Sequence, residues 1–208
     1  MTANALDRLT ILFSKLPGIG KKSAGRIVYH ILDSSPAFAD TLAKELSGLH
    51  KAILRCGVCG CFTETDPCQI CSDPERDASV ICVVECAQDV RIIEEGREFS
   101  GVYHVLGGLI APLEGISPAN LSIDKLINRL HEPAACADGT NSGSQVKELI
   151  LALNPTVEGD TTALYLQKIF KEYPLLITRL ASGMPVGGNI EYIDKLTLSR
   201  SFRGRIKI

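Results

Sequence analysis

Hydrophobic residues in the first quarter of the chain recur at the three- and four-residue spacing of helices that bury one face. Residues 4–13 fit an amphipathic helix, and a second helix is predicted to run through about Leu32. Between them, residues 16–20 read Leu-Pro-Gly-Ile-Gly, in which the proline and glycines end the first helix and permit a tight turn. A third helix is predicted over residues 36–54. The pattern therefore indicates a helical hairpin followed by one longer helix.

The middle of the chain alternates continuous apolar runs, typical of strands buried on both faces, with helical patterns. The strands are predicted at residues 80–84, 102–106, 149–153 and 175–180, the helices at 87–95, 123–130 and 161–173, and a polar loop at 132–144. Strands that alternate with helices predict a parallel α/β sheet. Glu85 and the polar residues of 154–160 follow two of these strands, where such sheets place their sites.

Composition and charge limit the function classes. The chain has 208 residues, of which 45% are hydrophobic and 22% charged, as in a globular protein. It has no run of 18 apolar residues, so no membrane-spanning helix and no membrane partner are expected. Residues 1–56 carry eight Lys and Arg against four Asp and Glu, residues 57–194 nine against twenty, and residues 195–208 five against none. Basic ends favour a polyanion partner, although solvated helix faces give a similar pattern.

The cysteines give the strongest chemical signal. Cys56 and Cys59 form one C-x-x-C pair, and Cys68 and Cys71 form another eight residues later. Two such pairs make the closed four-thiolate site of a structural zinc ion, one per chain. The alternatives are two disulfides or a redox pair. Residues 1–10 lack the apolar core of a secretory signal, so we expect a reducing cytoplasm, where disulfides are rare.

A zinc ion held by four thiolates has no open position, so it cannot activate a water molecule. We expect it to hold the helical part and the α/β part of the chain at a fixed angle. The remaining thiols are interpreted as one spare and three ordinary ones, namely Cys61 and then Cys82, Cys86 and Cys136.

The second helix begins just after Gly20, and free N–H groups at a helix N-terminus bind phosphate. Lys22 and Arg26 are i,i+4 neighbours on one face of that helix, and Lys21 is adjacent. This arrangement resembles a helix-hairpin-helix motif, which grips the sugar-phosphate backbone without reading bases. The expected DNA-binding residues are these three basic side chains. The alternative is a plain helical hairpin with a solvated basic face.

A strand that ends in Glu85, with Glu158 and Asp160 around a glycine after a later strand, resembles the toprim signature of topoisomerases and primases. In that family three carboxylates hold Mg²⁺ for phosphoryl transfer. Asn154 and Thr156 stand where the family has two aspartates, so the anionic oxygens that a hard cation needs are missing. We therefore expect Mg²⁺ to be an unlikely cofactor and catalysis to be absent. The remaining acids serve either in protein docking or as acids that favour a helix N-terminus.

The order of these parts, followed by Pro-Val-Gly-Gly at 185–188 and a basic tail, resembles the RecR family of bacterial recombination mediators over essentially the whole chain. Residues 134–144 look longer than the corresponding family loop, and Asn189 stands where the family more often has Asp. The resemblance implies an α+β protein of four modules. These are a helix-hairpin-helix DNA-binding domain (1–54), a four-cysteine zinc finger (55–72), an α/β toprim domain with a parallel sheet (79–174) and a C-terminal β and basic oligomerisation segment (175–208).

For function, the resemblance implies a cytoplasmic, nucleoid-associated DNA-repair accessory protein that is not an enzyme. Such proteins form homodimers and ring-like homotetramers that can encircle duplex DNA. The implied partners are RecO and, in many bacteria, RecF, with which the protein helps to load RecA recombinase on single strands coated by single-strand-binding protein. Lys22 and Arg26 match the family's DNA-binding positions. Glu158 and Asp160 match a surface implicated in RecO contact, and Glu85 is added to that acidic set.

Two other interpretations compete with this one. The first is a metal-dependent toprim nuclease or phosphotransferase that uses Glu85, Glu158 and Asp160. Cleavage of DNA in the presence of Mg²⁺ or Mn²⁺ distinguishes it from the non-catalytic mediator. The second is a scaffold without DNA contact, which salt-dependent DNA binding distinguishes.

Overall fold

The computed structural model describes residues 4–131 and 145–205. The chain divides into two compact units, Met1–Ile53 and Leu54–Ile208. The polar loop expected at 132–144, and Cys136 within it, lie outside the described residues.

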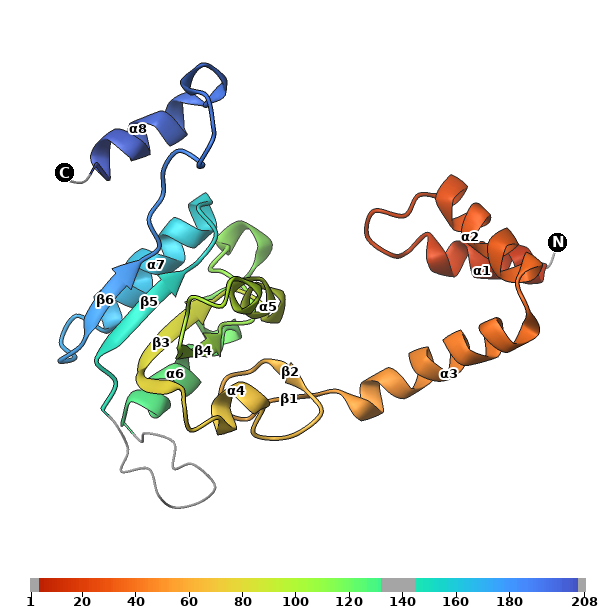
Figure 1. The fold of residues 1–208 in the computed structure, drawn as a ribbon, viewed down its shortest axis with the longest axis horizontal. Helices are drawn as coiled ribbons and strands as arrows, with labels where there is room; N and C mark the ends of the chain where they lie inside the picture. Colours follow the sequence, from red (N-terminus) through yellow and green to blue (C-terminus); the bar gives the residue numbers. More distant parts are fainter. Residues whose placement is uncertain (1–3, 132–144, 206–208) are drawn as a thin grey trace. The chain divides into compact units, whose positions relative to one another are not determined.

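The first unit is the expected helical module (Figure 1). Its helices are α1 (Ala5–Phe13), α2 (Lys21–Asp33) and α3 (Pro36–Ala52). Asn4 begins α1 with a capping box in which its side chain accepts a hydrogen bond from the Asp7 amide at 2.8 Å. Pro36 occupies the first turn of α3, where its missing N–H costs nothing. Ala24 and Val28 of α2 are the buried residues of this module among those described, so most of its apolar side chains remain at the surface.

The second unit begins with a small zinc-finger-like subdomain. Strands β1 (Leu54–Arg55) and β2 (Phe62–Thr63) pair antiparallel and are followed by the one-turn helix α4 (Gln69–Ser72). The third helix of the chain therefore ends at Ala52, slightly before the expected end at residue 54, because Leu54 and Arg55 already pair with β2.

A four-stranded parallel sheet forms the centre of the second unit. Its strands are β3 (Asp77–Val84), β4 (Gly101–Val105), β5 (Glu148–Ala152) and β6 (Leu176–Arg179), in the order β4-β3-β5-β6. The helices that accompany it are α5 (Ala87–Gly96), α6 (Ile123–His131), α7 (Val157–Ile169) and α8 (Lys195–Arg203), with 3-10 turns η1 (Pro112–Glu114), η2 (Pro118–Asn120) and η3 (Ile190–Tyr192). The expected parallel α/β sheet is confirmed.

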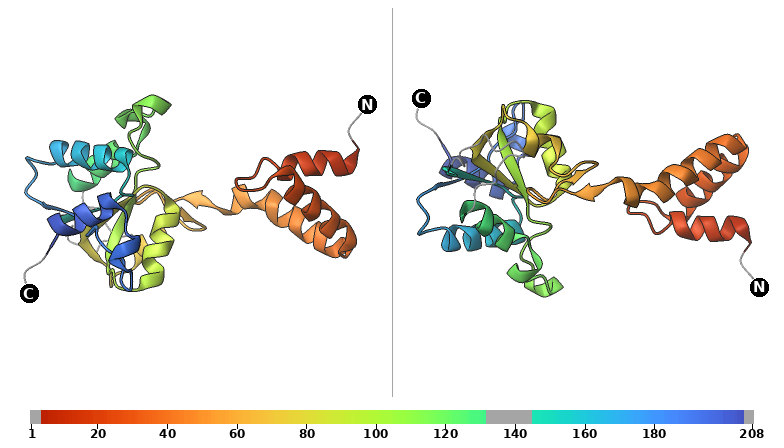
Figure 2. Two further views of the ribbon diagram at one scale, coloured as in Figure 1. Left: turned by 90° about the horizontal axis from the view of Figure 1, so that it is seen from above. Right: turned by 90° about the horizontal axis from the view of Figure 1, so that it is seen from below.

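Alternate residues of the strands face two separate cores. Ile81 and Val83 of β3 pack with buried residues of α6 and α7 on one face of the sheet. Cys82 and Val84 pack on the other face, with Val90 of α5 and with the cysteines of the zinc-finger subdomain. Figure 2 shows the same division, with α6 and α7 on one side of the sheet and α5 on the other. The cysteine cluster is thus part of a sheet core.

Three local features differ from the expectation. Helix α7 begins at Val157 and not near residue 161, because the Thr156 side chain caps it by accepting from the Gly159 amide at 3.1 Å. Strand β6 lies beyond residue 174, where the toprim domain was expected to end, yet it pairs with β5 and belongs to the sheet. Helix α8 was not expected, because its residues show only three large apolar side chains and no clear helical stripe.

Candidate zinc centre, acidic sheet edge and basic hairpin

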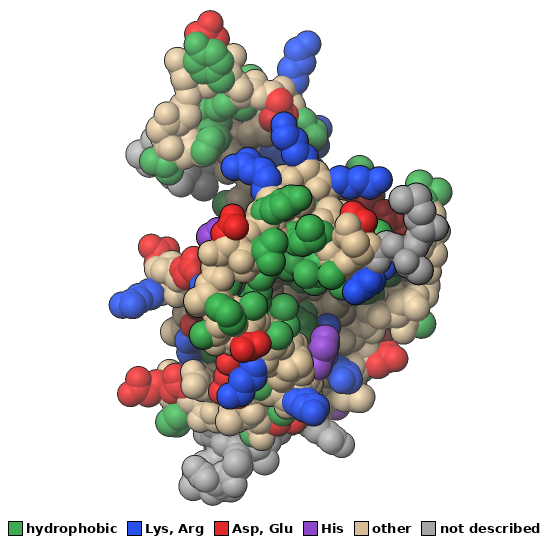
Figure 3. All heavy atoms as spheres, turned by 90° about the vertical axis from the view of Figure 1, so that its right-hand side faces the viewer, with side chains coloured by type: hydrophobic (Ala, Val, Ile, Leu, Met, Phe, Trp, Pro, Cys, Tyr) green, Lys and Arg blue, Asp and Glu red, His purple; other side chains and the backbone are tan. Residues whose placement is uncertain are grey.

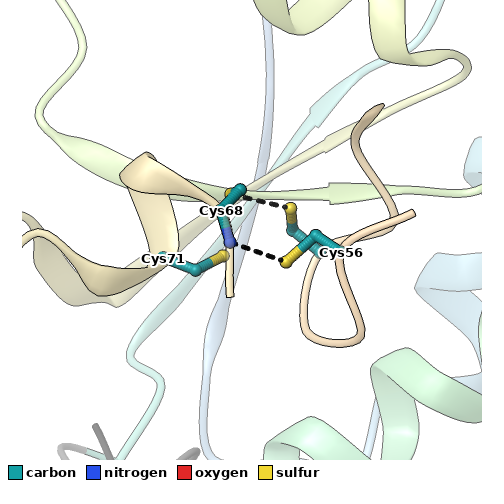
Figure 4. A group of neighbouring side chains, drawn as sticks. Cys56, Cys68 and Cys71 are labelled. Atoms are coloured by element: carbon teal, nitrogen blue, oxygen red, sulfur yellow. Dashed lines mark hydrogen bonds between the residues drawn. The ribbon is translucent and has the colours of Figure 1, made fainter. Parts of the chain in front are cut away.

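The sulfur atoms of Cys56, Cys59, Cys68 and Cys71 all lie within 4.8 Å of one another. The two sulfurs of Cys59 and Cys68 are 3.6 Å apart. A tetrahedral zinc ion with Zn–S bonds of about 2.3 Å requires sulfur separations of about 3.8 Å. Figure 4 shows Cys56, Cys68 and Cys71 pointing toward one another, Cys56 from the turn after β1 and the other two from the start of α4. The turn that holds each C-x-x-C pair is a knuckle. The two expected C-x-x-C pairs therefore converge on one point of suitable size.

Backbone hydrogen bonds shape each pair. The Cys61 amide donates to Cys59 Sγ at 3.5 Å, and the Cys68 amide donates to Cys56 Sγ at 3.4 Å. Gly60 adopts a φ of 81° between the first pair and Cys61, a conformation that L side chains rarely adopt. N–H groups aimed at sulfur stabilise thiolates, so both knuckles are arranged to present anionic ligands.

The charges of the four thiols support a bound cation. Hydrogen bonds from the thiols of Cys61, Cys68 and Cys71 hold the pKa of Cys59 far below its usual range. Donation to Cys59 in turn raises the pKa of Cys68 to about 11 and pushes that of Cys71 upward. One thiolate thus forms at the expense of the others, and all four ionise together only around a cation. The donor set therefore fits a structural zinc ion.

The other cysteines lie outside this cluster. Cys61 is buried beside it but is not among the four converging sulfurs. Cys82 is buried in β3, where burial raises the pKa of its thiol to about 12, as expected of an inert core thiol. Cys86 is half-buried at the N-cap of α5, where its backbone amide donates to Asp89 Oδ2 at 2.9 Å.

The toprim acids are held by different partners. Glu85 stands at the C-terminal end of β3, and its Oε2 accepts a 2.8 Å hydrogen bond from the side-chain amide of Asn154, at the end of β5. Glu158 is exposed in the first turn of α7. Among the described residues, the four cysteines are the group of His, Cys, Asp and Glu ligands close enough to hold a metal ion. Glu85, Glu158 and Asp160 do not converge in this way.

Asp160 is bound by two arginines. Its Oδ1 lies 2.6 Å from Arg179 Nη2 at the end of β6, and its Oδ2 accepts from Arg200 Nη2 of α8 at 2.9 Å. The sequence pattern did not reveal these partners. Arg179 ends a strand at the same sheet edge as Glu85, which was a usable signal, whereas Arg200 lies forty residues from Asp160 in a helix that was not expected.

The hairpin between α1 and α2 carries the three basic residues Lys21, Lys22 and Arg26 at the start of α2. Gly18 adopts a φ of 78° in the turn, and Gly20 caps α2 without a side-chain hydrogen bond. Lys21, Lys22 and Arg26 are all exposed, and none of them forms an ion pair with a described carboxylate. Figure 3 shows lysine and arginine side chains beside hydrophobic ones at the surface. The helix start can therefore offer backbone donors and three cationic side chains to an anion.

Within the part of the chain that the structure describes, no helix combines the length and the apolar character needed to cross a bilayer.

Known families match the chain in four consecutive segments. They are the RecR helix-hairpin-helix family at 6–49, the RecR zinc-finger family with four cysteines at 53–73, the toprim domain family at 79–181 and the RecR C-terminal family at 183–206. The fold and the cysteine site thus define a helix-hairpin-helix, zinc-finger and toprim protein, and the zinc expectation is confirmed.

Full-length relatives narrow this class to one family. The chain is 54% identical to Recombination protein RecR of Treponema denticola over 204 residues, which is 98% of this chain and 99% of that protein. It is 51% identical to Recombination protein RecR of Treponema pallidum, over 97% of this chain and 94% of that protein. The identity to Recombination protein RecR of Moorella thermoacetica is 46%, over 96% of this chain and 95% of that protein. The chain belongs to the RecR family of recombination proteins.

Proposed function

We propose that this chain acts in DNA recombination and repair in the bacterial cytoplasm as a non-catalytic, ring-forming DNA clamp. It works with RecO (and RecF) to help load RecA on single strands coated by single-strand-binding protein. The observation that carries this proposal is the exposed basic start of α2 within a chain that belongs to the RecR family. The relatives' names support the process, and the hairpin supports the contact with DNA.

The proposed DNA contact is made to backbone phosphates. Lys21, Lys22 and Arg26 carry positive charge next to the free backbone donors of α2, and these groups suit a phosphate more than a base edge. With two or three cations per subunit, the DNA affinity of one subunit is low and depends only weakly on salt concentration. Several subunits must therefore bind the same DNA for it to be held tightly. A closed oligomer with the basic hairpins turned inward meets that need in a protein of net charge −2.

The experiment that tests this contact compares two double variants of equal charge change. Lys22→Glu with Arg26→Glu reverses two charges at the hairpin, and Lys44→Glu with Lys51→Glu reverses two on the exposed surface of α3. Fluorescence anisotropy with labelled duplex and single-stranded DNA at low salt is expected to show a loss of at least about tenfold for the first pair only. Retention of DNA by the first double variant contradicts the assignment.

Oligomerisation is supported by the apolar surface of the helical module. Helices α1 and α3 bury no residue within the described chain. Large side chains are exposed along the module, namely Leu9, Ile11, Leu12, Leu16, Tyr29, Leu32, Phe38, Leu46 and Leu49. An apolar surface of this kind is typical of a protein interface. Light scattering with and without DNA is expected to give a dimer or tetramer, and a monomer at micromolar concentration contradicts the clamp.

The lack of catalysis is supported by the contacts of the toprim acids. Glu85 accepts a hydrogen bond from the side-chain amide of Asn154, and Asp160 forms ion pairs with two arginines. Both carboxylates are therefore engaged within the protein. A nicking assay with Mg²⁺ and with Mn²⁺ is expected to show no cleavage. Cleavage that Glu85→Gln abolishes establishes instead the competing toprim nuclease.

The acidic toprim residues are proposed to bind RecO. Glu85, Glu158 and Asp160 lie at the C-terminal edge of the sheet or in the first turn of α7, where they can meet a basic partner. Glu158→Gln and Asp160→Asn are each expected to weaken RecO binding in calorimetry. Glu114→Gln serves as the control, because Glu114 is also exposed but lies in η1, away from these acids in sequence.

A further inference from the structure

The zinc centre carries more negative charge than its own knuckles offset. Four thiolates bring twice the charge of one Zn²⁺ ion, so the loaded centre is an anion. Three of its cysteines are buried, and Cys71 is half-buried. The amides of Cys61 and Cys68 donate to two of the sulfurs, which offsets part of the charge. An anion buried to this extent needs a cation close by.

Helix α6 places an arginine at the outer edge of β4. Leu106 donates its amide to β3, and the backbone groups of alternate residues point to opposite edges of a strand, so those of Tyr103 and Val105 point outward. The Val105 amide donates to the Cys59 carbonyl oxygen at 2.8 Å. The Tyr103 carbonyl oxygen accepts from Arg129 Nη1 at 2.6 Å. In a parallel ladder one residue of the next strand bonds to both outward groups, so the Arg129 guanidinium lies beside the first knuckle.

Arg129 has no carboxylate partner within the described residues. Its side chain is half-buried, and its hydrogen bond to the Tyr103 carbonyl oxygen supplies an acceptor but no countercharge. Burial lowers the pKa of Arg129, and the charges of the four zinc-binding cysteines, of which Cys71 contributes most, oppose that lowering. The thiolates are therefore the anionic groups that act on this guanidinium.

Arg55 is adjacent to Cys56 in the chain, and its environment differs from that of Arg129. Its side chain is exposed, and its guanidinium carbon lies 4.6 Å from the centroid of the Phe62 ring. Water and salt screen an exposed charge much more than a half-buried one. Arg55 is therefore a comparison for Arg129, with the same charge close to the same cysteines in sequence.

We propose that Arg129 is the countercharge of the zinc centre. Its guanidinium group balances part of the negative charge that the zinc-bound thiolates retain, and its donation to the Tyr103 carbonyl oxygen holds it at the strand edge. Arg129 acts on the metal through the ligands, so it is a positioning residue and not a ligand. Because it belongs to α6, zinc affinity depends on the folded toprim sheet as well as on the four cysteines. This role is independent of the proposed DNA clamp.

The first test separates the charge of Arg129 from its hydrogen bond. Arg129→Lys keeps the charge, and Arg129→Gln removes the charge but keeps a side-chain N–H donor. Arg55→Gln makes the same change at the exposed arginine. The zinc affinity of each full-length protein is measured by competition with a chromogenic chelator. Arg129→Gln is expected to weaken zinc binding about ten- to a hundredfold, and the other two variants by less than about threefold.

Three results of this comparison overturn the proposal. An equal loss in Arg129→Lys and Arg129→Gln assigns the effect to the hydrogen bond or to packing and not to charge. Unchanged affinity in Arg129→Gln removes the effect itself, and an equal loss in Arg55→Gln assigns the compensation to exposed charges. If Arg129→Gln does not fold, Arg129→Lys decides, because a folded lysine variant that retains zinc supports the charge role and an unfolded one overturns it.

The second test changes the charge of the centre. Cys71→His replaces one thiolate by a neutral imidazole and keeps four ligands, so the loaded centre is less anionic. In this background Arg129→Gln is expected to cost less zinc affinity than in the wild type, by about threefold or more. An arginine with a purely structural role costs the same affinity in both backgrounds, so equal costs overturn the proposal.

Discussion

The backbone amide of Val105 donates a 2.8 Å hydrogen bond to the carbonyl oxygen of Cys59. Val105 ends β4, which is the edge strand of the sheet, and Cys59 is one of the four converging cysteines. The two residues also belong to one buried cluster. The first knuckle therefore accepts a hydrogen bond from the end of β4, whose outer edge has no neighbouring strand in the sheet. Loss of the metal is expected to disturb the sheet as well as the finger.

The first prediction concerns the metal. Cys68→Ser is expected to give insoluble or loosely folded protein, because four-thiolate zinc supplies folding free energy on the order of 10 kcal/mol in small sites. Cys61→Ser is the matched control, since Cys61 is buried beside the cluster but outside the four sulfurs. Elemental analysis is expected to find one zinc per chain in the control. A soluble, cooperatively melting Cys68→Ser protein contradicts the structural role.

The second prediction concerns a partly buried ion pair between Arg76 and Glu94. Glu94 of α5 accepts hydrogen bonds from Arg76 at 2.5 Å and from the Tyr103 hydroxyl at 2.5 Å. The hydrogen bonds from Arg76 hold the pKa of Glu94 below its usual range. Glu94→Gln removes the nearer countercharge of a largely buried guanidinium and leaves only Asp73, 3.7 Å from Arg76 Nε, so we expect a loss of about 1–3 kcal/mol in the free energy of unfolding.

Glu95→Gln is the control for this loss, because it makes the same chemical change one residue along α5. Glu95 pairs with Arg91, and both side chains are mostly exposed, at 67% and 85%. Exposed pairs of this kind contribute less than about 1 kcal/mol. Urea denaturation of the two variants compares the sites directly, and equal midpoints contradict a structural role for the Glu94 network.

The elements that could be predicted from sequence are those whose signal is local. The C-x-x-C spacing identified Cys56, Cys59, Cys68 and Cys71, and the apolar runs located the four strands. The hairpin is also local, because the proline and glycines of its turn are close together in sequence.

Features that depend on long-range pairing could not be predicted in this way. The contacts of Asp160 join α7 to β6 and α8, and nothing in the spacing of Arg179 or Arg200 indicates a shared partner. The start of α7 was misplaced for a related reason. Thr156, which stands where the toprim family has an aspartate, is also the N-cap of that helix. One residue type can serve either purpose, and only the fold distinguishes them.

The third prediction concerns acid stability. His104 is 1% exposed, and its Nε2 lies 2.9 Å from the Ser122 carbonyl oxygen, which assigns the proton to Nε2. Nδ1 has no hydrogen-bond partner among the described residues. Burial lowers the pKa of His104 to about 4. In the unfolded chain the histidine has a pKa of about 6.5, so it binds a proton there first as the pH falls. Stability is therefore lost between about pH 6.5 and pH 4.

The measurement compares wild type with His104→Gln, which keeps an amide donor but does not titrate. At pH 7.5 the variant is expected to be less stable because its packing changes. By pH 5.5 the wild type loses about 1.5 kcal/mol from this histidine and the variant does not, so the difference between them shrinks by that amount. Zinc content is measured at both pH values, because acid also protonates thiolates. A difference that stays constant with pH contradicts the assignment.

The fourth prediction concerns the altered toprim edge. Asn154→Asp places a carboxylate where an amide now donates to Glu85 at 2.8 Å. Two like charges about 4 Å apart repel by about 1 kcal/mol even in bulk water, so the variant is expected to unfold at lower urea concentration at pH 7.5. Millimolar Mg²⁺ is expected to restore the lost stability, because two adjacent carboxylates suit a hard cation.

Asn189→Asp makes the same change at the cap of η3, where no carboxylate contact occurs among the described residues, and Mg²⁺ is expected to leave the stability of this variant unaffected. If Mg²⁺ stabilises the unaltered protein as much as Asn154→Asp, the amide is not what replaces the metal at this edge, and the account of a metal-free toprim domain is wrong.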